Sequence, residues 1–212
     1  MIINIRGSHG SGKTTLVRDF LTQYGATPRY GALGLMKPQA YLVAIPSVPT
    51  GVYVLGPYLT ATGGADNIQP YPLVCKLISK YAAMGHVIFE GVLISTTYGA
   101  VGELMERFGE SVMIFLNTPL EQCIRNVQSR RDARGDARPF DPAQLMAKAL
   151  SIAKVRERVI REGKLRVVDA DSTSAPETIL RLLKDQSGLP KLPKDASEVC
   201  LGEPTASVHW AE

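Results

Sequence analysis

Eight residues near the start of the chain carry groups suited to binding phosphate. They match the pattern G-x-x-x-x-G-K-[ST] without a departure and read Gly7-Ser8-His9-Gly10-Ser11-Gly12-Lys13-Thr14. The glycines let the backbone wrap with its N–H groups inward, forming an anion nest at the start of a helix. Lys13 would reach the β- and γ-phosphates, the Thr14 hydroxyl would hold Mg²⁺, and Thr15 would complete the nucleotide contacts. The loop predicts that the protein binds a nucleoside triphosphate.

Glu90 is a candidate for a second part of the metal site. It closes the apolar segment 86–89 and is followed by Gly91. In a parallel sheet, the strand beside a phosphate loop commonly ends in an acid that orients Mg²⁺ or its water. The alternative is an ordinary carboxylate that faces water at the end of a strand.

Asp66 lies in the glycine-containing segment 56–67, which leaves another predicted strand. A short acid at this place would accept a proton from an attacking hydroxyl. Asp and Asn also favour caps and turns, and a cap or turn before Pro70 explains Asp66 equally well. Both interpretations stay open from the sequence.

Four arginines gather where two predicted helices are interrupted, at Arg130, Arg131, Arg134 and Arg138. Guanidinium groups bind phosphate oxygens in a fixed fork, and a mobile segment that carries them would close over ATP. We expect at least one of Arg130, Arg131 and Arg134 to be catalytic, with Arg130 also touching the nucleotide. The alternative is a solubilising turn in which the arginines pair with nearby aspartates.

Asp171 follows the last predicted strand, where a purine base often packs in sheets of this kind. Backbone groups around Asp171 would contact adenine, which makes it a candidate for binding the nucleotide. The alternative is that the polar residues 169–174 cap the closing helix.

The elements that must position these residues alternate between strands and helices. Short apolar runs predict core strands at 2–5, 52–55, 86–89, 112–116 and 165–168. Helical spacing and stop signals predict helices from 13 onward and at 70–84, 120–131, 142–162 and 176–184. A further apolar run, 41–45, is expected to pair with 52–55 through a turn. The alternation predicts an α/β fold with a mainly parallel sheet and helices on both faces.

Composition narrows the class of protein further. The chain has 212 residues, 45% of them hydrophobic, and fits one globular domain. No apolar run approaches the ~20 residues of a membrane span, and Met1 leads directly into the first strand. Three separated cysteines predict a reduced protein without structural zinc, so we expect a cytoplasmic location and no membrane partner.

Positive charge is concentrated in one part of the chain. The net charge is +4, yet residues 125–166 hold twelve Lys and Arg against five Asp and Glu. A basic block beside a phosphate site can serve ATP, a phosphorylated substrate or a nucleic acid. A solvated helical face is the plainer explanation for Lys148, Lys154, Arg158 and Arg161.

Together, the phosphate loop, Glu90 and the arginine-rich break resemble those of the P-loop nucleoside and nucleotide kinases. The resemblance implies a three-layer fold with a five-stranded sheet in the order 2-3-1-4-5, a kinase domain at 1–185 and a lid at about 130–140. It implies ATP and Mg²⁺ as cofactors, and it leaves a tail of uncertain order at 186–212. Thymidylate kinases carry an Asp-Arg pair after the third strand, where this chain has Glu90 and Gly91.

The opening 2–7 and the loop 56–67 are similar to those of small phage-encoded P-loop kinases. Some members phosphorylate 5-hydroxymethyluracil in DNA, a step towards hypermodified thymine. This resemblance implies a hydroxymethylated pyrimidine in DNA as the acceptor, and the infected host cytoplasm as the location. A free nucleoside or nucleotide kinase and a non-kinase P-loop NTPase are the alternatives, and the oligomeric state is left open.

Overall fold

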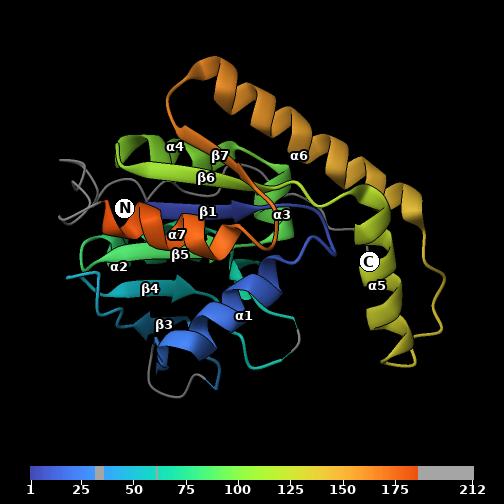
Figure 1. Cartoon of the computed structure of the whole chain (residues 1–212), viewed down its shortest axis with the longest axis horizontal. Coiled ribbons are helices and arrows are strands. Elements are labelled where there is room, and N and C mark those ends of the chain that lie inside the picture. The colour runs from blue at the N-terminus through green and yellow to red at the C-terminus, as the bar shows by residue number, and fades with distance from the viewer. Residues whose placement is uncertain (32–35, 61, 186–212) are drawn as a thin grey trace.

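The computed structural model describes residues 1–31, 36–60 and 62–185. The tail predicted at 186–212 lies outside the described residues. In the described part, seven α-helices surround one sheet (Figure 1). The strands are β1 (Ile2–Arg6), β2 (Ala26–Arg29), β3 (Ala40–Val43), β4 (Val52–Leu55), β5 (His86–Glu90), β6 (Ser111–Leu116) and β7 (Arg166–Ala170). The helices are α1 (Lys13–Tyr24), α2 (Pro72–Ala82), α3 (Val92–Thr96), α4 (Gly99–Arg107), α5 (Leu120–Asp132), α6 (Pro142–Glu162) and α7 (Ala175–Lys184).

The sheet confirms the α/β class, but the prediction of five strands is wrong. It has seven strands in the order β2-β3-β4-β5-β1-β6-β7 and is mixed. Strands β4, β5, β1, β6 and β7 are parallel to one another. At one edge of the sheet, β3 pairs antiparallel with β4, and β2 pairs antiparallel with β3. The predicted pairing of the run 41–45 with 52–55 is confirmed, with Tyr41 opposite Val54.

Strand β2 escaped prediction because it lies at the edge and is mostly exposed. Its sequence is short and polar and contains Pro28, a residue that sheets accept on edge strands. Such a strand has no buried face and therefore no alternation of apolar residues to read.

Two hydrophobic layers hold the helices to the sheet. On one face α2, α4 and α6 pack against side chains such as Phe89 and Met113. On the other face α1 and α7 pack against side chains such as Ile3 and Ile88. Strands β1, β5 and β6 are buried along their whole length, which explains why they read as apolar runs.

Helix α5 stands beyond the sheet, next to the first turns of α6 (Figure 1). The two helices share a small core that includes Cys123, Val127 and Leu145. Both helices agree closely with the predicted segments, whereas α3 and α4 were not predicted. Among the described residues, the helices are all too short or too polar to cross a membrane.

Candidate active site

The phosphate loop joins β1 to α1 at the edge where the parallel strands end, and the region of β6 and α5 holds it in place. Thr118 Oγ1 donates to the carbonyl oxygen of Ser11 at 2.9 Å, and Asn126 Nδ2 donates to that of Gly10 at 2.8 Å. Gly10 has a φ of 77°, and a Cβ there would lie 2.3 Å from the carbonyl oxygen of Cys123. Only glycine fits this close approach between the loop and α5.

Lys13 is buried at the base of this loop. Its Nζ donates to the carbonyl oxygens of Gly7 at 2.7 Å and Ser8 at 2.8 Å. Burial lowers the pKa of Lys13, while the nearby carboxylates of Glu90 and Asp66 act in the opposite direction. Thr15 is exposed on the first turn of α1. The structure thus gathers Lys13 and two acids at one end of the sheet.

Glu90 is the last residue of β5 and is only 2% exposed. Its Oε1 accepts a hydrogen bond from Thr14 Oγ1 at 2.9 Å. Burial raises the pKa of Glu90 to about 7, although Lys13 and the Thr14 hydroxyl act to lower it. The alternative of a strand-end carboxylate that faces water is therefore wrong for this structure.

Asp66 lies in a single 3₁₀ turn, Ala65–Asn67, close to Glu90. Its carboxylate accepts hydrogen bonds from the backbone N–H groups of Val92 (2.5 Å), Leu93 (3.1 Å) and Ile94 (3.4 Å). These are the first amides of α3, so Asp66 caps this helix and not one that follows Pro70. A role for Asp66 as proton acceptor stays a prediction.

Gly91 makes this arrangement possible between β5 and α3. A Cβ at Gly91 would lie 2.3 Å from Asp66 Oδ1. A larger residue after Glu90 would therefore push Asp66 away from the start of α3. Glycine at position 91, where the resemblance to thymidylate kinases would place an arginine, thus has a steric reason in this chain.

Arg6, the last residue of β1, contacts the opposite end of α3. Its Nη1 donates to the carbonyl oxygens of Thr97 (2.8 Å) and Ser95 (3.3 Å), and burial lowers its pKa to about 10. A carboxylate at the start of α3 and a guanidinium at its end both complement the helix dipole. The sequence carried one sign of this residue, a charge in an apolar strand directly before the phosphate loop.

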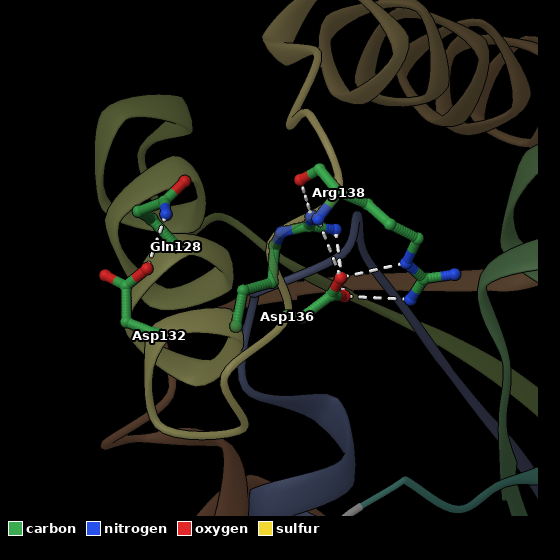
Figure 2. A network of polar contacts seen from close by, with 5 residues as sticks. Gln128, Asp132, Asp136 and Arg138 are labelled. Atoms are coloured by element: carbon green, nitrogen blue, oxygen red, sulfur yellow. Dashed lines mark hydrogen bonds and ion pairs between the residues drawn. The ribbon is translucent and has the colours of Figure 1, made fainter.

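The arginines of the break divide into two groups. Asp136 forms ion pairs with Arg131 at 3.3 Å and Arg138 at 2.8 Å (Figure 2). Asp132 instead accepts a hydrogen bond from Gln128 at 2.7 Å. Within residues 1–31, 36–60 and 62–185, Arg130 and Arg134 have no carboxylate partner.

Of these two arginines, Arg130 lines the same cavity as His9 of the phosphate loop, and its charge acts to lower the pKa of His9. His9 contacts Lys148 of α6, with 3.0 Å between Nε2 and Nζ. Lys148 stood out in the sequence only as part of the basic block. The contact between this lysine and the loop depends on how α5 and α6 pack.

Asp171 occupies the turn before α7. Its Oδ1 accepts hydrogen bonds from the backbone N–H groups of Thr173 and Ser174, both at 2.8 Å, and from the Thr173 hydroxyl. These amides belong to the turn before α7, and the N-cap residue Ser174 makes no side-chain capping bond, so Asp171 orders the turn and does not cap the helix itself. A Cβ placed on Gly12 would lie 3.6 Å from Ser172 Cβ, so the turn lies beside the phosphate loop. Contact with adenine there stays a prediction.

A phosphate loop after the central strand, a buried acid bonded to its threonine and an arginine-bearing pair of helices define a P-loop phosphotransferase. No family model matches the chain. Comparison with individual curated proteins is more specific.

The chain is 31% identical over 170 residues to a 5-hmdU DNA kinase of Pseudomonas phage M6, covering 76% of this chain and 87% of that protein. It is 31% identical over 185 residues to the 5-hmdU DNA kinase of Pseudomonas phage PaMx11, covering 86% and 97%. A 5-hmdU DNA kinase of Delftia phage PhiW-14 is 22% identical over 178 residues, covering 76% and 65%. The chain belongs to the family of phage 5-hmdU DNA kinases, and it is an ATP-using kinase.

Proposed function

We propose that this kinase transfers the γ-phosphoryl group of ATP to the hydroxymethyl group of 5-hydroxymethyluracil in DNA, in the cytoplasm of a phage-infected cell. The observation that carries the proposal is that two relatives named 5-hmdU DNA kinase, those of phages M6 and PaMx11, match this chain over 87% and 97% of their length. The site is also suited to phosphoryl transfer, because a phosphate loop, two carboxylates and cations without acidic partners lie together there.

Thr14 and Glu90 are suited to hold Mg²⁺. Their oxygens are 2.9 Å apart at the mouth of the phosphate loop, and Mg²⁺ prefers such hard donors together with substrate phosphates. Because the nucleotide phosphates would supply the other ligands, such a site needs no cluster of three protein ligands. The described residues contain no such cluster. When bound, Mg²⁺ would neutralise charge on the β- and γ-phosphates.

The chain's own groups would position the triphosphate and the acceptor. Lys13 would exchange its carbonyl contacts for phosphate oxygens, and Arg130 would approach the transferring group from α5. In the transfer, the bond between the γ-phosphorus and the bridging oxygen breaks, and its electron pair stays on ADP. The acceptor hydroxyl oxygen forms the new bond, and its proton passes to a water molecule, because Asp66 is bonded to the amides of α3 and Glu90 to the Thr14 hydroxyl.

A base in DNA would reach these groups only after leaving the stack. Enzymes that act on a base inside a duplex extrude it into the active site. Cations of the basic block that have no acidic partner would then contact the flanking phosphates. In the described part of the chain, and apart from Arg130 and Lys148 beside the phosphate loop, these are Arg125, Arg134, Lys154, Arg161 and Arg166.

Transfer of a radioactive γ-phosphate tests the proposal directly. The acceptors compared are DNA with 5-hydroxymethyluracil, unmodified DNA of the same sequence, free nucleosides and monophosphates. We expect label only on the hydroxymethylated DNA, since unmodified thymine lacks the primary hydroxyl, and no label with Lys13→Ala. Labelling of a free nucleoside or monophosphate, with none on hydroxymethylated DNA, would overturn the proposed acceptor.

A further inference from the structure

His9, at the third position of the phosphate loop, contacts a side chain that lies 139 residues later in the sequence. Lys148 Nζ and His9 Nε2 are 3.0 Å apart, and both residues are half-buried. Lys148 reaches the loop because the first turns of α6 pack on α5, where Leu145 shares a core with Val127. The contact therefore links the nucleotide loop to the helix pair that carries the arginines.

The polarity of this contact follows from the surroundings of His9. Burial lowers the pKa of His9 to about 4, and the charges of Lys148, Lys13 and Arg130 act in the same direction. The ring is therefore neutral near pH 7, and Nε2 accepts a hydrogen bond from the Lys148 ammonium group. An ammonium group has three N–H donors, so two remain for another acceptor.

A cavity of about 240 Å³ lies between α5 and α6 beside His9. Arg130, Arg131, Lys148 and Asp141 all line it. Arg131 is paired with Asp136, and Asp141 caps α6 by accepting from the Ala143 N–H group at 2.9 Å. Within the described residues, Arg130 and Lys148 are the lining cations without a carboxylate partner.

Lys13, Arg130 and Lys148 thus surround His9 from three different elements. Like charges brought together in a partly buried place repel one another, and a polyanion between them would turn that repulsion into attraction. From its position in the loop, Lys13 is expected to bind the β- and γ-phosphates. Lys148 lies within hydrogen-bonding distance of His9 in the same loop, so its two other donors are available beside the loop.

We propose that Lys148 is a further catalytic residue, which contacts the transferring phosphoryl group, and that His9 is the positioning residue that holds it over the phosphate loop. The inference rests on the phosphoryl transfer described under Proposed function. Lys148 gives and takes no proton in that step. Its charge stabilises the γ-phosphate oxygens while the bond to ADP breaks and the bond to the acceptor oxygen forms.

Replacement of Lys148 gives the first test. We expect Lys148→Met to lower kcat about 10²-fold, the effect of removing one donor aimed at developing charge, and to change the KM for ATP much less. Lys148→Arg should recover most of the rate. The matched control is Lys184→Met, which removes an exposed charge from α7 on the opposite face of the sheet. A parent-like kcat for Lys148→Met would overturn the proposal.

The role of His9 is tested by a double-mutant cycle. His9→Ala should lower kcat about 10-fold in the parent and have no further effect in Lys148→Met, because it acts through that lysine. His9→Gln keeps an acceptor and should recover part of the rate. Effects that multiply in the double variant would show that His9 does not position Lys148.

Two measurements distinguish this proposal from a structural effect of the substitutions and from an error in the proposed acceptor. An unchanged Tm and an unchanged affinity for ADP in each variant exclude a merely structural effect. If Lys148→Met does not fold, Lys148→Gln takes its place. If hydroxymethylated DNA takes no label from the parent, the proposed acceptor fails. The same variants on whichever acceptor does take label still decide the role of Lys148.

Discussion

The hydrogen bond between Thr14 and Glu90 sets the local chemistry of the site at the scale of single residues. It joins the start of α1 to the end of β5 across 76 positions of sequence. Glu90 is buried, and burial raises its pKa to about 7, so the neighbouring Lys13 is important for holding negative charge there. A buried carboxylate beside a phosphate loop is suited to organising a cation.

Substitution of Glu90 tests this function. Glu90→Gln keeps the shape and an oxygen that accepts from Thr14, but it removes the charge. We expect the rate of transfer to fall about 10²-fold and the Mg²⁺ concentration needed for half-maximal rate to rise. Initial rates over a Mg²⁺ titration measure both, with Glu103→Gln on the exposed face of α4 as the control. A parent-like rate and metal requirement would make Glu90 a structural residue.

At the scale of elements, the five-residue helix α3 depends on charges from two other elements. Asp66 bonds three amides at its start, and Arg6 bonds two carbonyl groups near its end. A helix this short has little stability of its own, so these contacts fix its direction. Because α3 follows Gly91 directly, they also fix the end of β5, where Glu90 lies.

This arrangement predicts that Asp66 acts mainly as a cap. Asp66→Ala should lower the free energy of unfolding by about 1 kcal/mol, while Asp66→Asn should keep most of the stability, because Asn caps helices as well as Asp does. We expect kcat of Asp66→Asn to stay within about tenfold of the parent. A loss of 10²–10⁴-fold at unchanged Tm would instead identify Asp66 as the general base. Urea unfolding and steady-state rates are the measurements.

At the scale of the whole molecule, the structure divides the basic block into compensated and uncompensated charges. Arg158 pairs with Glu162 at 2.7 Å and lies over the ring of Tyr98 at 4.4 Å. Arg156 pairs with Asp169, and Lys164 pairs with Glu106. The charges of these three cations are balanced within the fold, whereas the cations of the block without acidic partners among the described residues are available to an anion from outside the chain.

The salt dependence of transfer to DNA measures how many cations neutralise phosphates. Each contact contributes roughly −0.9 to the slope of log affinity against log salt for duplex DNA. We expect Arg134→Ala to make this slope shallower by about 1 and to weaken binding at low salt. Arg158→Ala should leave the slope unchanged, since Glu162 already balances its charge. Equal slopes for parent and Arg134→Ala would remove Arg134 from the DNA surface.

A second molecular property is stability in acid. His86 is fully buried, with Nδ1 2.9 Å from the amino group of Met1, and burial lowers its pKa to about 4. The unfolded chain takes up this proton near pH 6.5, so the contribution of His86 to stability is complete above pH 6.5 and is lost towards pH 4. His86→Gln should therefore show a smaller fall in Tm than the parent between pH 7 and pH 5. Calorimetry at both pH values measures the two Tm changes. An equal decrease in Tm for the parent and His86→Gln would contradict this prediction.

The sequence by itself determined the elements that local chemistry specifies. The phosphate loop, its flanking strand and helix, and the helices α5 and α6 follow from glycine placement and hydrophobic periodicity. Burial of Glu90 also agreed with the apolar strand that precedes it. These features depend on residues close together in the chain, which is why a linear pattern is enough to predict them.

Only the tertiary structure decided which groups meet. It added β2 at the sheet edge, a strand that the sequence did not reveal because an exposed edge strand carries no apolar pattern. It turned Asp66 towards α3, divided the arginines through Asp136, and brought Lys148 to His9. Each of these contacts joins groups of different elements or of an irregular turn. Their partners are set by packing in three dimensions, and residue types and spacing do not encode that packing locally.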